Sequence, residues 1–222
     1  SKKNIFRRKG KKSPKHEEEQ IQTHAKIARE AYIPHHQREN NIDGYIYQKD
    51  QSHDKRAVYH HPSKDHSIIG QRGTVPSDID DVADDLNIAF GRSIKDNNRR
   101  WKEEDDFVNK AKKNAKKVSL TAHSLGTAYT KELGMKHNLE SHNFNSGSSP
   151  HPNQVIRNGI HALNPKTHTY AVNTDIISTT DPFTKNRINR KSHLDSHSMN
   201  NFIKGASKKL VDEFKRIRKA LT

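Results

Sequence analysis

The feature that most constrains the fold is an alternation of short strand-like segments with amphipathic helices. Val118–Thr121 has the apolar, β-branched character of a buried strand, and Leu125–Leu133 follows it at once with the composition of a helix. Strands that alternate with helices typically form a mostly parallel sheet. We therefore predict an α/β fold with a mostly parallel central sheet flanked by helices. Further strands are predicted at Tyr45–Tyr47, Ala57–Tyr59, Ser67–Gln71, Asn143–Asn145 and Thr169–Val172.

Helical spacing of apolar residues locates the other helices. The first should start at Ser13 and Pro14, a cap residue followed by proline at the first helical position, and should stop before Pro34. Its apolar stripe runs from Ile21 to Tyr32. Comparable stripes predict helices from Ser77 to Phe90, from Trp101 to Lys116 and from Leu210 to Leu221.

The net charge of +15 is concentrated at the two ends of the chain. We divide the chain into a basic arm (1–16) that we expect to be disordered on its own, a near-neutral domain (17–203) and a basic amphipathic C-terminal helix (204–222). Such basic extensions favour an anionic partner, which can be nucleic acid, a capsid or a membrane surface.

Several classes of protein are excluded by composition. The chain has no cysteine, which removes disulfides, thiolate zinc sites and cysteine nucleophiles. It has no apolar run near the roughly 20 residues of a transmembrane helix, and no apolar segment of a secretory signal follows the basic arm. We therefore expect an intracellular protein with no transmembrane segment.

The segment from Ala122 to Gly126 carries the chemistry. A serine between a strand and a helix, with small residues two positions before and after it, is the nucleophile-elbow pattern, here with Ala122 in place of the first glycine. The sharp turn would push the Ser124 hydroxyl out of the sheet, and the Leu125 N–H would point at a developing oxyanion. The alternative is a strand–helix turn that has no catalytic role.

These residues resemble the class 3 lipases, a branch of the α/β-hydrolases. The motif AHSLGT at 122–127 is similar to their GHSLGG elbow, and SIIGQRGT at 67–74 is similar to their strand ending in Arg-Gly-Thr. The acidic stretch from Asp78 to Leu86 and the segment HNFNSG at 142–147 also match, so the resemblance covers about residues 21–203. In this chain Thr127 replaces a glycine of the signature and adds a side chain at the start of the helix.

The resemblance implies a role for each matching position. Ser124 would be the nucleophile, Asp175 the acid and His197 the base, with Thr74 and Leu125 donating the oxyanion N–H groups. Asp181 and His193 are the alternative acid and base. The order Ser, Asp, His is that of α/β-hydrolases.

The implied activity is hydrolysis of carboxylic esters of lipids or phospholipids, without a cofactor. Such lipase-like proteins also occur in large DNA viruses and related elements, so packaging in a virion for breach of a host membrane is a hypothesis. The rival hypothesis is a non-enzymatic, virion-associated structural protein that retains a hydrolase fold and whose basic ends bind nucleic acid or capsid. A nucleic-acid-binding module is a third hypothesis.

Histidines are abundant in this chain, 16 in all, and metal binding is one role that they could have. His193 and His197 have a spacing that can bind metal on a helix, but no carboxylate pattern supports it, so no metal site is assigned. We expect the remaining histidines to belong mainly to a solvated polar surface.

Overall fold

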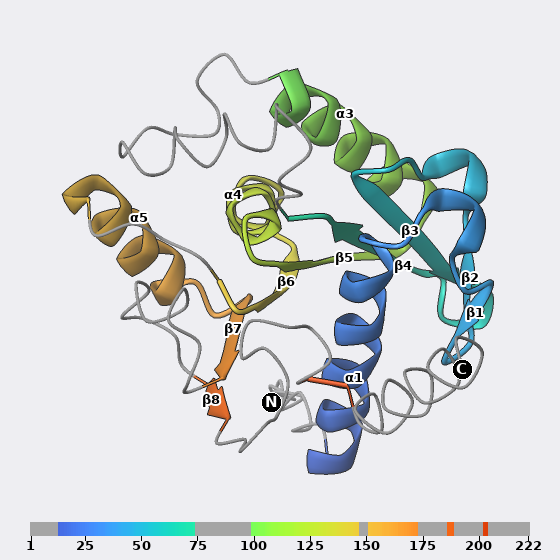
Figure 1. Cartoon of the computed structure of the whole chain (residues 1–222), viewed down its shortest axis with the longest axis horizontal. Coiled ribbons are helices and arrows are strands. Elements are labelled where there is room, and N and C mark those ends of the chain that lie inside the picture. Colours follow the sequence, from blue (N-terminus) through green and yellow to red (C-terminus); the bar gives the residue numbers. More distant parts are fainter. Residues whose placement is uncertain (1–12, 74–98, 147–150, 173–185, 189–201, 204–222) are drawn as a thin grey trace, which may run out of the picture.

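The computed structural model describes residues 13–73, 99–146, 151–172, 186–188 and 202–203. Within these residues, eight strands form one sheet in which each strand lies beside the next one in the sequence (Figure 1). The pairs from β1 to β4 are antiparallel, and those from β4 to β8 are parallel. The strands are β1 (Asn41–Ile42), β2 (Tyr45–Tyr47), β3 (Arg56–His61), β4 (His66–Gln71), β5 (Lys117–His123), β6 (Glu140–Phe144), β7 (Thr167–Val172) and β8 (Asn186–Ile188).

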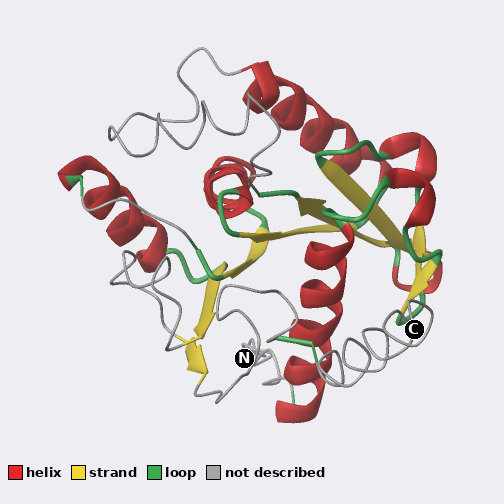
Figure 2. Cartoon of the chain, in the orientation of Figure 1, coloured by secondary structure: helices red, strands yellow, loops and turns green. Residues whose placement is uncertain are grey.

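Helices cover both faces of this sheet (Figure 2). Side chains alternate along β5: the Thr121 hydroxyl donates to the His24 carbonyl of α1, whereas Leu120 packs with residues of α3 and α4. Helix α1 therefore lies on one face, and α3 and α4 lie on the other. The α-helices are α1 (Pro14–Glu30), α3 (Arg99–Asn114), α4 (Gly126–His137) and α5 (Pro152–Leu163), and short 3-10 helices span His35–Gln37, Lys49–Gln51 and Pro62–Lys64. None of the helices in the described ranges is long and apolar enough to cross a membrane.

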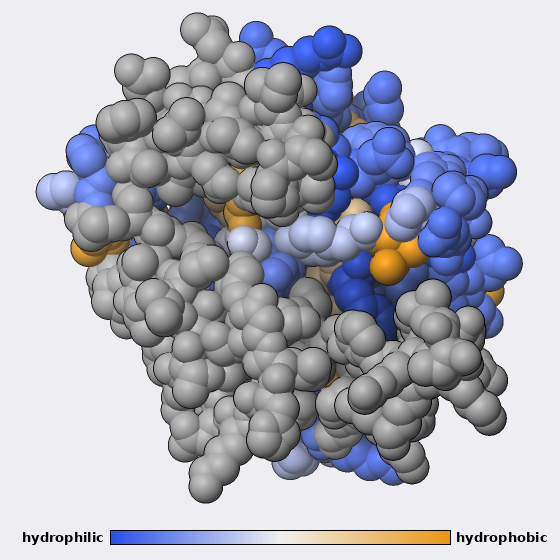
Figure 3. Space-filling model, viewed as in Figure 1, coloured by the Kyte–Doolittle hydropathy of each residue, from blue (hydrophilic) through white to orange (hydrophobic). Residues whose placement is uncertain are grey.

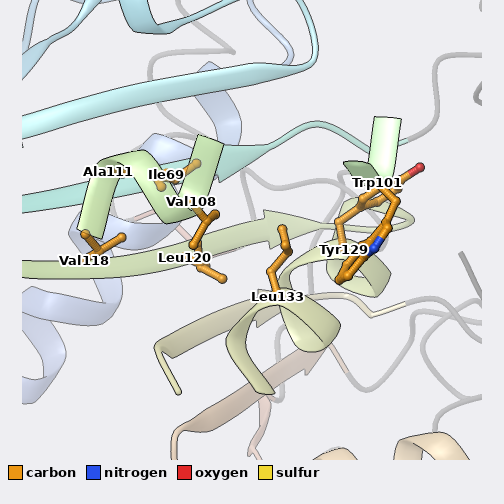
Figure 4. Packing of buried hydrophobic residues seen from close by; sticks show 8 residues of the cluster. All are labelled: Ile69, Trp101, Val108, Ala111, Val118, Leu120, Tyr129 and Leu133. Atoms are coloured by element: carbon orange, nitrogen blue, oxygen red, sulfur yellow. The ribbon is translucent and has the colours of Figure 1, made fainter. Parts of the chain in front are cut away.

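An apolar cluster fills the space between β5 and the helices α3 and α4. Figure 4 shows Leu120 of β5 below Val108 of α3, with Trp101 and Tyr129 at one end of the cluster. Burial of such side chains from water is the main force that holds the layers together. The whole cluster comprises Ile69, Trp101, Val108, Ala111, Val118, Leu120, Tyr129 and Leu133.

The opposite face, toward α1, is built differently, because histidines join its apolar residues. His24, His66 and His142 are almost completely buried, so the expectation of a solvated surface is wrong for these three residues. The Ser119 hydroxyl lies 2.8 Å from His24 Nε2 and 2.9 Å from His66 Nε2, and His66 Nδ1 lies 2.8 Å from the Tyr45 hydroxyl. The imidazoles of His24 and His66 are tolerated here because the surrounding groups satisfy their hydrogen bonds.

The predicted elements agree with the structure in type and place, with some differences at their ends. The first helix starts at Pro14 with Ser13 as its N-cap, as predicted, so the last residues of the basic arm are helical. Helix α4 passes the predicted stop at Leu133 and ends at His137, where Asn138 adopts the left-handed cap conformation. Helix α5 and strands β1 and β8 were not predicted. The helices predicted at 77–90 and 210–221 lie outside the described residues.

Candidate active site

Ser124 lies in the turn between β5, which ends at His123, and α4, which begins at Gly126. Its φ is +55°, in the left-handed region, and its side chain is partly exposed. The Ser124 N–H donates to the Phe144 carbonyl at 3.1 Å, which ties the turn to β6. A residue other than glycine pays about 1–2 kcal/mol for this conformation, and such residues cluster at functional sites. The turn thus has the geometry that the elbow pattern predicts.

Two glycines let the end of β4 approach this turn closely. A Cβ atom on Gly126 would lie 2.5 Å from the Gln71 carbonyl oxygen, and one on Gly73 would lie 2.7 Å from the His123 carbonyl oxygen and 3.1 Å from Ser124 Cβ. Real Cβ atoms do not approach other atoms so closely, and therefore only glycine fits at either position. The Arg-Gly-Thr segment consequently begins against the serine turn, as the family resemblance implies.

Tyr32 fixes the relative position of these two segments. Its hydroxyl accepts a hydrogen bond from the Gly73 N–H at 2.9 Å and lies 3.2 Å from the His123 carbonyl oxygen and 3.0 Å from His123 Nδ1. The hydroxyl has one proton, which it donates to one of these two acceptors. His123 thus contacts Tyr32 through its ring. The role of Tyr32 could not be deduced from the sequence.

The two departures from the elbow signature are both accommodated. Ala122 is fully buried within β5. Thr127 Oγ1 donates to the Ser124 carbonyl at 2.7 Å and lies 2.9 Å from Ser146 Oγ. The threonine therefore adds a side-chain link between the start of α4 and the serine turn.

A buried polar network that includes α3 holds the end of β4, in addition to the contact of Tyr32 with Gly73. Glu104 is completely buried on α3, where Gln71 donates to Oε2 and Arg56 contacts Oε1 at 3.1 Å. Burial alone would raise the pKa of Glu104, but the hydrogen bond from His53 and the charge of Arg56 outweigh burial and lower it. Arg100 donates to the Arg72 carbonyl at 2.7 Å, directly before Gly73. Charged and amide groups thus position the backbone that meets the elbow.

The structure brings together only part of the predicted site. Ser124 and Leu125 are described, with Leu125 at the N-terminal end of α4, where helix N–H groups have no partner within the helix. The other predicted site residues, Thr74, Asp175, Asp181, His193 and His197, lie outside the described residues. The assignment of the acid and the base therefore stays a prediction.

A second group of polar side chains lies at the amino-terminal ends of β6 and β7, whereas Ser124 follows the carboxyl end of β5. Glu140, His142 and His168 direct one ligand atom each toward a common point, and these atoms all lie within 4.8 Å of one another. Sequence reasoning missed this group because its residues were read as polar surface. The available signal was a Glu-x-His sequence directly before one predicted strand and a histidine directly before the next one.

Comparisons with known proteins complete the description of the fold. No family model matches the chain, and no curated protein matches it by sequence. A solved structure, the Lip2 lipase from Yarrowia lipolytica, is similar, with a TM-score of 0.52 at 12% sequence identity over 79% of this chain and 78% of that one. The fold is α/β-hydrolase-like. At this identity the similarity shows the fold alone.

Proposed function

We propose that this chain is a serine esterase of the lipase type that hydrolyses carboxylic esters of lipids or phospholipids. The observation that carries the proposal is the left-handed, partly exposed Ser124 in a turn from strand to helix, packed against Gly73. Strain of this kind persists only where surrounding contacts impose it. The lipase-like fold supports the proposal, since a nucleophilic serine occupies this turn in α/β-hydrolases.

The proposed mechanism proceeds through an acyl-enzyme. His197 would take the proton from the Ser124 hydroxyl while Asp175 orients the imidazole, and Oγ would attack the ester carbonyl carbon. The N–H groups of Leu125 and Thr74 would stabilise the negative oxygen of the tetrahedral intermediate. Protonated His197 would give its proton to the leaving alcohol, and water would then release the acid by the reverse sequence.

The lipid character of the substrate rests on the resemblance and on the fold. On the face shown in Figure 3, the described surface is mostly hydrophilic. The large apolar side chains that are exposed within the described residues are Ile46, Ile156, Ile160 and Leu163, of which the last three lie on α5. Short-chain nitrophenyl esters would test the chemistry, and phospholipid vesicles would test the substrate class.

Hydrolysis by two serine variants tests the proposal. Ser124→Ala should remove ester hydrolysis, because loss of a triad nucleophile in a serine protease costs about 10⁶-fold in rate. Ser63→Ala, which changes an exposed serine on a 3-10 helix, should leave the rate unchanged. A Ser124→Ala protein that is folded and hydrolyses esters at the wild-type rate would contradict the proposal. His197→Ala and Asp175→Ala would then separate the predicted base and acid from His193 and Asp181.

Packaging in a virion is a separate part of the proposal, which rests on the resemblance to lipase-like proteins of large DNA viruses. If it is correct, the protein should be present in purified virus particles. Its absence from such particles would remove this part of the proposal and leave the esterase chemistry untouched.

A further inference from the structure

The convergence of Glu140, His142 and His168 follows from strand geometry. Glu140 and His142 are two residues apart on β6, so their side chains point to the same face of the sheet. His168 is the residue of β7 that pairs with His142 across the parallel ladder. All three therefore face α1 at the amino ends of neighbouring strands.

The two distances from the Glu140 carboxylate to the histidine nitrogens fit a shared metal ion better than direct hydrogen bonds. Glu140 Oε1 lies 3.5 Å from His142 Nε2 and 3.5 Å from His168 Nε2. Both separations are longer than a good N–H···O hydrogen bond of 2.7–3.2 Å. Two ligands of a tetrahedral zinc ion, each about 2.0–2.1 Å from the metal, lie about 3.4 Å apart. Small side-chain adjustments would therefore place an ion between these atoms.

One nitrogen of the group lacks the partner that a buried polar atom normally has. His142 is 3% exposed, and its Nε2 has no hydrogen-bond partner within the described part of the chain. Leaving such an atom unsatisfied costs about 1–3 kcal/mol. Its Nδ1 lies 3.1 Å from the Tyr170 hydroxyl. If Nδ1 carries the proton, Nε2 presents a lone pair to the shared point, which is the arrangement that metal-binding histidines use.

Neighbouring residues hold the Glu140 carboxylate in place, and a pocket beside it gives an ion access from solvent. Gln20 donates to Glu140 Oε1 at 3.2 Å, and Lys117 Nζ lies 3.3 Å from Oε2. A pocket of about 470 Å³ is lined by Glu140 and His168, and the His168 side chain is 34% exposed. An ion can thus reach the site.

We propose that Glu140, His142 and His168 bind one Zn²⁺ ion, with the fourth coordination position open to the adjacent pocket. Two imidazoles and one carboxylate are a ligand set that zinc accepts in tetrahedral sites with one open position. The ion would link the amino ends of β6 and β7 and so stabilise the folded chain by mass action. The site is separate from Ser124, because four residue steps along β6, about 13 Å, separate Glu140 from Phe144 beside the serine turn.

The test uses the untagged full chain, stripped with a chelator and titrated with Zn²⁺ alone. We expect one equivalent to bind and the melting temperature to rise with zinc. His168→Asn and Glu140→Gln should each weaken binding by about 100-fold or more, beyond the roughly 10–100-fold that loss of an outer-sphere partner costs. His36→Gln, which changes an exposed histidine on a 3-10 helix, should bind zinc like the wild type.

Two further arms keep the result unambiguous. A double variant, His193→Gln with His197→Gln, should retain the zinc site; loss of binding in this variant but not in His168→Asn would overturn the proposal. X-ray absorption of the zinc-loaded wild type needs no variant and should show two imidazole nitrogens and a carboxylate oxygen. Absence of zinc binding by the folded wild type, or a shell of water oxygens only, would also overturn it.

Discussion

Ser119 and Ser124 lie five residues apart along β5 and its turn, and they differ in exposure and in backbone conformation. Ser119 has two imidazole nitrogens within 2.9 Å but is completely buried. Ser124 is partly exposed and is held in a left-handed turn at the other end of the strand. A histidine contact alone therefore does not identify a nucleophile. Exposure and backbone geometry distinguish the two serines.

The hydrogen-bond pattern around Ser119 shows how its hydroxyl and the two neighbouring imidazoles are satisfied inside the protein. The Gln20 carbonyl lies 2.7 Å from His24 Nδ1, which assigns that proton to Nδ1 and leaves Nε2 to accept from the Ser119 hydroxyl. His66 Nε2 then donates to Ser119 and its Nδ1 accepts from the Tyr45 hydroxyl. Each side chain in this series of hydrogen bonds is neutral and has a partner. Ser119 therefore links α1 to strand β4 inside the protein.

Among the substitutions that leave Ser124 in place, the largest fall in ester hydrolysis should come from closing the space beside this serine. Gly73→Ala places a methyl group against the Tyr32 hydroxyl and the His123 carbonyl, and overpacking of this kind costs about 1–3 kcal/mol. Unfolding in urea should show this loss, and ester hydrolysis should fall with it. Gly44→Ala strains a left-handed turn remote from the elbow, so it should lower stability but keep hydrolysis. Normal activity in Gly73→Ala would show that the close approach is unimportant.

The buried serine should matter for stability alone. Ser119→Ala leaves His24 and His66 without their shared partner, and an unsatisfied buried polar group costs about 1–3 kcal/mol. Ser67→Ala removes one contact, to the half-exposed His60, and should cost less. Urea unfolding measures both variants. Loss of hydrolysis in folded Ser119→Ala would erase the distinction between the two serines.

The neutral state of the buried histidines predicts a dependence of stability on pH. Burial lowers the pKa of His66 to about 3, whereas an unfolded histidine has a pKa of about 6.5. Below pH 6.5 the unfolded chain therefore takes up a proton that the folded chain does not. The free energy of unfolding should fall by about 1.4 kcal/mol per pH unit for this residue until about pH 3. Chemical unfolding at several pH values tests this, and a flat profile would contradict it.

The smallest effect should come from Tyr32→Phe. The variant keeps the ring but removes the hydroxyl that joins Gly73 to His123, and a net hydrogen bond contributes about 1 kcal/mol. If the whole loss raises the activation free energy, because the serine turn is held less well, ester hydrolysis should slow about fivefold. An unchanged rate with reduced stability would assign Tyr32 a purely structural role.

The sequence predicted the elements that have strong local signals. Ser13 and Pro14 locate the start of α1, and the alternation around β5 locates the turn at Ser124. The predicted helix ended at Leu133, directly before Gly134, whereas in the structure Gly134 packs against Ser141 and α4 continues to His137. Tertiary packing overrode the local preference.

The group formed by Glu140, His142 and His168 could not be predicted from local sequence patterns. Whether His142 and His168 face water or each other depends on the register between β6 and β7, which no single segment specifies. The contact of Tyr32 with Gly73 likewise joins residues 41 positions apart. Local sequence determines the position of the elbow, but it does not determine the contacts that support it.

The central claim is that Ser124, and not Ser119, is an activated nucleophile. The most direct test is to treat the native chain with a fluorophosphonate and to locate the adduct by peptide mass mapping. The account predicts one adduct, on Ser124, which is lost in Ser124→Ala and retained in Ser119→Ala. A folded wild-type protein without any adduct, or with the adduct on another serine, would contradict it.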